Sequence, residues 1–292
     1  MNEYENAIEI KDITKKYDGF TLENVNFNVP TGSIMGFIGQ NGAGKTTTIR
    51  SLLNIISIDS GEIKMLGLDH IKNEYEIKER IAVVFDELPF HDSFTGEALS
   101  KMFSGLYREW DKKEFFRLCE RFRLPVKKKL SKFSKGMKMK MQIATALSHN
   151  AELLIMDEAT TGLDPVVRDE ILHIFMEYLR DGERSILMSS HITGDLEKIA
   201  DSVTFIDKGK TLITGYKDDI LDTHGVIKCT REEYADIDPA DFISARLNDF
   251  GVEIMTADRM AVAKKYSGAA IEKTTLEEIM LFYVNRDKKE WS

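Results

Sequence analysis

The clearest chemistry in the sequence belongs to a glycine-rich segment, Gly39-Gln40-Asn41-Gly42-Ala43-Gly44-Lys45-Thr46-Thr47. It fits the pattern G-x-x-x-x-G-K-[ST], in which the glycines let backbone N–H groups surround a phosphate. We expect Lys45 to reach the β- and γ-phosphates and the Thr46 hydroxyl to ligate Mg²⁺. The segment therefore predicts a site for a nucleoside triphosphate.

A pair of acids, Asp157 and Glu158, follows the apolar run of residues 153–156. An acid at the end of such a strand holds Mg²⁺ in phosphate-loop enzymes, which is the role we expect for Asp157. We expect Glu158 to point the other way and to act as the general base for an attacking water. Two solvated acids at a strand end would give the same pattern, but the phosphate segment upstream favours catalysis.

The elements around these motifs predict an α/β core with a parallel sheet. Residues 34–38 form an apolar run typical of a strand that is buried on both faces. Apolar positions recur at helical spacing in residues 46–56, directly after the glycines. Further along, strand patterns at 153–156, 185–188 and 203–206 alternate with helical patterns at 166–179 and 195–200.

Two other segments differ from this alternation. Residues from about 88 to 150 are mostly helical in pattern, which indicates a helical insertion. After Gly215 the composition becomes more acidic, and short strands are expected at 227–230, 252–255 and 260–263, with a helix at 274–285. We interpret residues 216–292 as a small appended α+β domain.

Between the two nucleotide motifs lies the segment Phe133-Ser134-Lys135-Gly136-Met137, followed by a helix-like run. With it the chain resembles the ATP-binding subunits of ABC transporters, and in particular the ABC-2-type, bacitracin-export-like subgroup of Gram-positive bacteria. The family signature is LSGGQ, so Ser134 and Gly136 are retained while Lys135 replaces a glycine. The resemblance implies that Ser134, Lys135 and Gly136 bind ATP held by the opposite subunit. Ser134 also suits the N-cap of the following helix.

Other motifs of the family follow in order. Thr161-Gly162-Leu163-Asp164 is similar to the D-loop, which places Asp164 at a dimer interface. His191 is similar to the switch histidine that contacts the γ-phosphate, although a lone histidine can also be an ordinary surface or core residue. Tyr17 occupies the position that stacks on adenine, and simple packing is the alternative. Asp86 stands where the family usually has Gln, and a carboxylate there can still ligate Mg²⁺.

The resemblance implies a P-loop NTPase fold, with an ABC cassette at residues 1–215, a helical subdomain at about 88–150 and a C-terminal accessory domain at 216–292. It implies an ATPase that uses ATP and Mg²⁺ to energise an exporter through separate membrane-spanning subunits. It also implies a dimer, either a homodimer or a heterodimer with a related ATPase subunit. The expected location is cytoplasmic, peripheral on the inner face of the cell membrane.

Composition and short motifs disfavour several other classes of protein. The chain has 292 residues and a net charge of −9, which disfavours nucleic acid as a partner. No run approaches the about 20 apolar residues that span a bilayer, and the two cysteines exclude a disulfide framework. One alternative is a soluble ABC-type ATPase that acts in DNA repair, on ribosomes or in iron–sulfur assembly. Another is a small kinase or GTPase, but the guanine-binding pattern Asn-Lys-x-Asp is not present.

Overall fold

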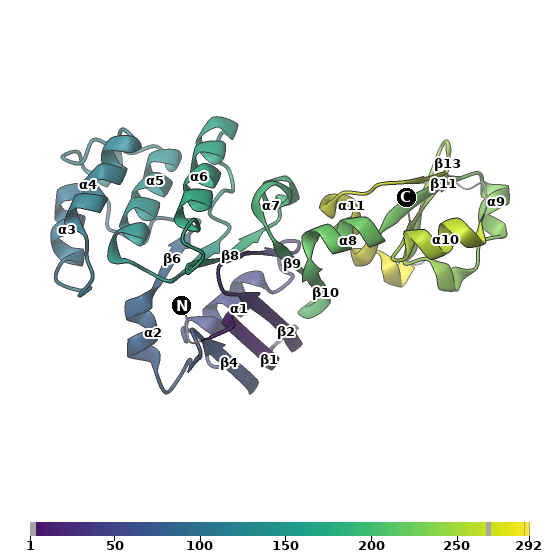
Figure 1. Cartoon of the computed structure of the whole chain (residues 1–292), viewed down its shortest axis with the longest axis horizontal. Coiled ribbons are helices and arrows are strands. Elements are labelled where there is room, and N and C mark those ends of the chain that lie inside the picture. The colour runs from purple at the N-terminus through teal and green to yellow at the C-terminus, as the bar shows by residue number, and fades with distance from the viewer. Residues whose placement is uncertain (1–3, 267–269, 289, 292) are drawn as a thin grey trace.

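The computed structural model describes residues 4–266, 270–288 and 290–291. Its centre is a six-stranded sheet (Figure 1). The strands lie in the order β10 (Lys210–Tyr216), β9 (Ser202–Asp207), β3 (Ile34–Ile38), β8 (Ser185–Ser190), β7 (Leu153–Asp157) and β6 (Ile81–Phe85). All neighbours are parallel except β10, which pairs antiparallel with β9. The predicted parallel sheet is therefore confirmed.

The buried central strands carry the phosphate segment. Every residue of β3, β7 and β8 is buried, as the apolar runs within these strands predict. The helix after the glycines, α1 (Lys45–Leu52), ends before residue 56, which we had expected it to reach. Asn54 has a φ of 53°, in the left-handed region, so the chain leaves the helical path there.

A second, antiparallel sheet forms the lower part of the molecule in Figure 1. Its strands are β2 (Phe20–Pro30), β1 (Asn6–Tyr17), β4 (Ser60–Met65) and β5 (Leu68–Asp69), and α2 (Glu74–Arg80) leads from it to β6. The buried faces of β1, β2 and β3 share one hydrophobic core. The end of the β1–β2 hairpin therefore lies beside the phosphate segment.

The helices between β6 and β7 lie to the left in Figure 1. They are α3 (Gly96–Phe103), α4 (Lys112–Arg121), the 3₁₀ turn η1 (Leu130–Lys132), α5 (Lys135–Ala146) and η2 (Leu147–His149). Their apolar faces pack on β6, β7 and α6 (Pro165–Tyr178) in one core. The helical pattern of this segment is confirmed, while its boundaries as a subdomain stay a prediction.

The C-terminal segment forms a separate five-stranded sheet at the right of Figure 1. Its order is β14 (Ala270–Glu272), β11 (Gly225–Cys229), β13 (Gly251–Thr256), β12 (Ser244–Asn248) and β15 (Glu290–Trp291). The other elements there are α8 (Lys217–Thr223), α9 (Arg231–Ala235), η3 (Pro239–Asp241), α10 (Arg259–Lys265), α11 (Leu276–Val284) and η4 (Arg286–Lys288). The predicted strands at 227–230 and 252–255 and the predicted helix at 274–285 are confirmed.

The strand predicted at 260–263 is wrong, because these residues lie inside α10. The side chain of Asp258 accepts a hydrogen bond from the N–H of Ala261 at 2.9 Å and so caps the helix. A four-residue apolar run does not distinguish a buried strand from one face of a short helix. The capping aspartate was the signal that would have decided between them.

The C-terminal segment is joined to the central fold through α7 (Thr193–Ile199). Leu276 and Ile279 of α11 are buried in the same core as Leu196 of α7. The backbone N–H of Leu276 donates to the Glu197 carboxylate at 2.6 Å.

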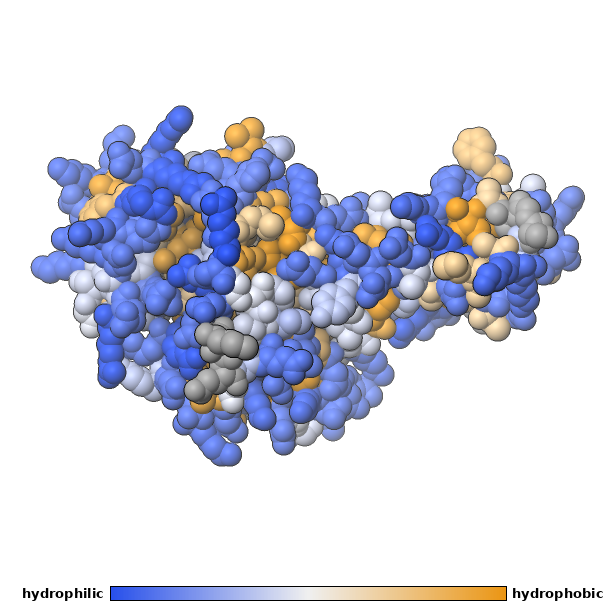
Figure 2. Space-filling model, in the orientation of Figure 1, coloured by the Kyte–Doolittle hydropathy of each residue, from blue (hydrophilic) through white to orange (hydrophobic). Residues whose placement is uncertain are grey.

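Hydrophilic residues cover most of the face in Figure 2, and hydrophobic ones gather near its centre, between α6 and α7. Among the described residues no helix is both long enough and apolar enough to span a bilayer.

Candidate active site

The phosphate segment, residues 39–47, connects β3 to α1, as its pattern predicts. Two of its glycines are required by sterics. A Cβ on Gly39 would lie 2.5 Å from the carbonyl oxygen of Ile206, and one on Gly44 would lie 2.7 Å from Leu22. Gly44 also has a φ of 116°, which side chains rarely adopt. The side chains of Gln40, Asn41 and Thr46 are exposed, so the rim of the loop is open to solvent.

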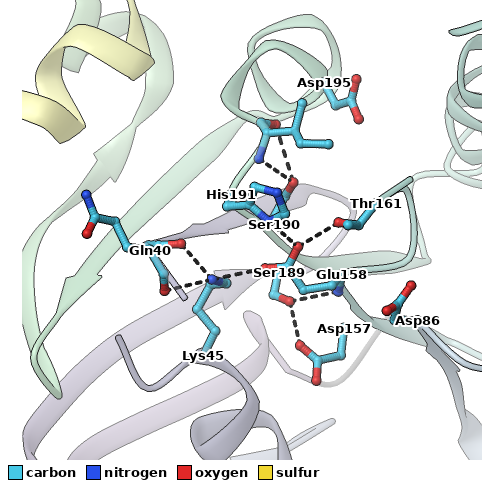
Figure 3. Close-up of polar contacts among 12 residues, drawn as sticks. Gln40, Lys45, Asp86, Asp157, Glu158, Thr161, Ser189, Ser190, His191 and Asp195 are labelled. Carbon is cyan, nitrogen blue, oxygen red and sulfur yellow. Dashed lines mark hydrogen bonds and ion pairs between the residues drawn. The ribbon is translucent and has the colours of Figure 1, made fainter. Parts of the chain in front are cut away.

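Lys45 is buried at the first position of α1. Its ammonium donates to the carbonyl oxygens of Gly39, at 2.6 Å, and Gln40, at 3.1 Å. It also lies 3.0 Å from Oε1 of Glu158, whose strand follows much later in the chain (Figure 3). The two sequence motifs therefore meet at one point, with opposite charges in contact.

The acidic pair lies where β7 ends. Asp157 is the last residue of the strand and is buried, whereas Glu158 lies just outside it with a φ of 54°. Strand alternation predicts that the side chain of Glu158 points away from that of Asp157. A left-handed backbone, which costs a non-glycine residue about 1–2 kcal/mol, sets its direction instead. The Glu158 N–H is held by the hydroxyl and the carbonyl of Ser189 on β8, at 3.1 and 3.2 Å.

The Glu158 carboxylate is the centre of a polar cluster (Figure 3). Oε2 accepts a hydrogen bond from the Thr161 hydroxyl at 2.8 Å and lies 2.7 Å from Nδ1 of His191. Burial acts to raise the pKa of Glu158. The hydrogen bond and charge of Lys45, helped by Thr161 and His191, outweigh it and hold the pKa below its usual range. The carboxylate is therefore ionised at neutral pH.

Asp86 follows β6 directly and lies beside this cluster. Phe85 is the register partner of Asp157 in the parallel β6–β7 pair, so Asp86 and Glu158 leave the same edge of the sheet. Figure 3 shows the Asp86 side chain on the same side as Asp157 and Glu158. One Asp86 oxygen lies 2.8 Å from the ammonium of Lys135.

The segment of Ser134, Lys135 and Gly136 lies at the start of α5, whose first residue is Lys135. The Ser134 side chain accepts a hydrogen bond from the N–H of Met137 at 3.3 Å, so it is the N-cap that its residue type predicted. The Asp164 side chain caps α6 in the same way and accepts hydrogen bonds from the N–H groups of Val166 and Val167, at 3.1 and 3.0 Å. Within the chain, this segment reaches the acidic edge of the sheet through Lys135.

Tyr17 is the last residue of β1, and its side chain is 45% exposed. Its register partner on β2 is Phe20. A Cβ placed on Gly44 would lie 3.2 Å from the ring of Phe20, so the hairpin end borders the phosphate segment. The Lys15 ammonium lies 5.7 Å from the centroid of the Tyr17 ring. The exposed part of the ring can stack on a base, so the adenine role stays a prediction.

The sequence assigned no role of their own to three residues that organise the site. The Ser189 hydroxyl donates to Oδ1 of Asp157 at 2.7 Å while it accepts from Glu158. Thr161 holds the Glu158 carboxylate. The Gln142 amide on α5 exchanges two hydrogen bonds with the Phe85 backbone, at 3.2 and 3.1 Å. The position of Ser189 at the carboxyl end of a buried strand was a usable signal, but the contacts of Gln142 were not visible in the sequence.

Residues 22–161 match the family model described as ABC transporter. The bacitracin transport ATP-binding protein BcrA of Bacillus licheniformis is 37% identical over 209 residues, which are 70% of this chain and 68% of that protein. The chain belongs to the ABC transporter family. Within it, the ABC transporter ATP-binding protein YhcH of Bacillus subtilis (strain 168) is 27% identical over 95% of this chain and 91% of its own length.

Solved structures agree with this family. The structure titled "Structure of ATP binding subunit of ABC transporter" superposes with a TM-score of 0.67 at 28% identity, covering 78% of this chain and 93% of that one. The chain is thus an ATP-binding subunit of the ABC transporter family. It has the fold of that family and an ATPase activity that is coupled to transport. The predicted fold class, ATPase function and family are confirmed.

Proposed function

We propose that the chain hydrolyses ATP at the cluster around Glu158 and so energises an exporter. The observation that carries this proposal is the convergence of Lys45, Thr161 and His191 on one carboxylate. These residues come from α1, the loop after β7 and the end of β8. A positive group for phosphate, an ionised base and an imidazole therefore share one site.

Each group has a distinct role in this proposal. The N–H groups of residues 39–47 and the Lys45 ammonium bind the β- and γ-phosphates. The phosphates compete with Glu158 for Lys45, which frees the carboxylate to accept a proton from the attacking water. His191 keeps Nδ1 toward Glu158, so the opposite edge of its ring is directed at the γ-phosphate. Thr161 fixes the carboxylate while this exchange takes place.

The oxygen donors at the site fit Mg²⁺, which supplies charge neutralisation for the phosphates when bound. Asp157 is buried, and Ser189 occupies its Oδ1, which leaves Oδ2 for a ligand. Thr46 and Asp86 are the other donors we propose. No all-protein cluster of three or more His, Cys, Asp or Glu suited to a metal ion exists in the described part of the chain. Mg²⁺ commonly takes one or two carboxylates together with substrate phosphates.

We further propose that two such subunits enclose two ATP molecules head to tail. In this dimer Ser134, Lys135 and Gly136 of one subunit contact the ATP held by the other, and Asp164 lies at the interface. Val166, two residues after Asp164, is 77% exposed, so an apolar side chain is available at the proposed interface. One chain carries every motif for both sites, so a homodimer suffices, and a heterodimer with a related subunit uses the same contacts.

Separate membrane-spanning subunits complete the proposed exporter, with this chain cytoplasmic and peripheral on the inner face of the membrane. The name of one relative assigns that protein to bacitracin transport, which supports a role in transport here, and export is the direction that the sequence resemblance implies. The net charge of −9 is unsuited to nucleic acid. Co-purification with a co-expressed membrane subunit tests this proposal against a soluble role.

The decisive experiment on the site is Glu158→Gln, with Glu97→Gln on the exposed start of α3 as the matched control. Loss of a general base lowers a rate by roughly 10²- to 10⁴-fold. We expect that loss in Mg-ATPase turnover for Glu158→Gln alone, with ATP affinity retained in calorimetry and an ATP-dependent dimer seen in light scattering. A Glu158→Gln protein that turns over at the control rate would exclude the proposed base.

A further inference from the structure

The ion pair between Lys135 and Asp86 joins two sites at which the chain departs from its family. Lys135 is the first residue of α5, and Asp86 is the first residue after β6. The Lys135 ammonium lies 2.8 Å from Oδ1 of Asp86. A lysine stands where the family has glycine, and an acid stands where it has neutral glutamine. The two replacements therefore have opposite charge and are in contact.

One atom of this pair is buried, although both side chains are partly exposed. The Lys135 side chain is 48% exposed and the Asp86 side chain 43% exposed, but the Oδ1 atom of Asp86 is buried. Among the described residues that oxygen has no partner with hydrogen-bond geometry, so the ammonium charge of Lys135 is what compensates its burial. A buried carboxylate oxygen without hydrogen bond or counter-charge is strongly disfavoured. Asp86 is therefore expected to move if Lys135 loses its charge.

The same helix also holds the backbone next to Asp86. Gln142, seven residues after Lys135 and so on the same face of α5, binds both the N–H and the carbonyl of Phe85. Backbone and side chain of the 85–86 segment are thus fixed from one helix. Lys135 also lies near the loop after β7, since a Cβ added at Gly162 would lie 3.2 Å from its ammonium. Gly162 adjoins Thr161, which holds Glu158.

We propose that Lys135 is a positioning residue for Asp86 within its own chain. Its ammonium holds the Asp86 carboxylate at the edge of the sheet from which Asp157 and Glu158 also project. An acid at position 86 is compensated by the base at position 135, and without the lysine its carboxylate would add an uncompensated negative charge at the edge of the sheet that carries Asp157 and Glu158. This assignment rests on the proposed function and adds a role in cis to the proposed contact of Lys135 with the partner's ATP.

A double-mutant cycle on the full-length protein tests the assignment. The variants are Asp86→Asn, Lys135→Met and the double variant, with Lys135→Arg as the conservative change and Lys138→Met on the same helix as the matched control. We measure kcat and KM for ATP hydrolysis with Mg²⁺, and urea midpoints report folding. Each single variant should lose at least fivefold in kcat with KM within twofold of the wild type. The loss in kcat of the double variant should be about tenfold smaller than the product of the two single losses. This difference corresponds to a coupling free energy of about 1.4 kcal/mol.

The controls separate positioning from folding. Lys135→Arg should keep most of the wild-type kcat, and Lys138→Met should keep kcat and the urea midpoint. The assignment would be overturned if the kcat loss of the double variant lies within twofold of the product of the two single losses, because independent residues give no coupling. That result would leave the proposed ATPase site intact if Glu158→Gln is still inactive. Wild-type protein without Mg-ATPase activity would instead refute the proposed function itself.

Discussion

Replacing Ser189 with alanine removes one hydroxyl that serves both acids of the site. Ser189 is fully buried on β8, and its hydroxyl donates to Oδ1 of Asp157 at 2.7 Å. A hydrogen bond to an ionised group contributes about 1.5–3 kcal/mol. The Glu158 N–H also loses the hydroxyl but keeps the Ser189 carbonyl at 3.2 Å, so it is not orphaned. We therefore expect Ser189→Ala to lower the free energy of unfolding by about 2 kcal/mol.

The next residue provides the matched control. Ser190 is equally buried, and its hydroxyl has only neutral partners: it accepts from the N–H of Ile192 at 2.9 Å and donates to the Ile192 carbonyl at a long 3.4 Å. A neutral hydrogen bond contributes only about 0.5–1.5 kcal/mol. Urea unfolding followed by circular dichroism measures both variants at neutral pH. We expect Ser189→Ala to be the less stable of the two and to lose turnover, because Asp157 is no longer held. Equal stability of the two variants would refute the argument that the charged partner makes the difference.

Two further predictions concern Glu158 and Tyr17. The pKa of Glu158 in the folded chain lies below its ordinary value of 4.5, so its contribution to stability is present above pH 4.5 and is lost as the pH falls through the folded value. The stability difference between wild type and Glu158→Gln, measured by urea unfolding, should shrink as the pH falls below 4.5, and a constant difference would contradict the cause given for the shift. Stacking of a base on an aromatic ring contributes about 1–3 kcal/mol. Tyr17→Ala should therefore weaken ATP binding about tenfold or more in calorimetry while Tyr17→Phe retains it, and equal affinities would assign the ring to packing.

Local sequence determined most of the central fold. The apolar runs of β3, β7 and β8 and the glycine pattern before α1 have periodicities and steric needs that act over a few residues. The order of the acids at residues 157–158 was equally visible. The direction of Glu158 was not, because a left-handed φ at a glutamate is imposed by Ser189, which lies 31 residues away in sequence. Tertiary contacts override local preference at such positions.

The pair Lys135 and Asp86 illustrates the same limit at longer range. The sequence showed each as a separate departure, one in the segment before α5 and one after β6, and assigned each its own ligand. Only the packing of α5 on β6, with Gln142 bonded to the Phe85 backbone, brings the two charges together. Two departures that look independent in the sequence are thus one electrostatic unit in the fold.

The position of His191 depends on contacts that reach the C-terminal segment. α7 begins two residues after His191 and carries Asp195, which lies 3.6 Å from the Arg168 guanidinium of α6. Burial raises the pKa of Asp195, although the Thr160 hydroxyl and Arg168 act against it. On the same helix the Glu197 carboxylate accepts a hydrogen bond from the N–H of Leu276, at the start of α11. The helix that follows the histidine is therefore fixed on one side by the central fold and on the other by residues that the sequence presented only as an appendage.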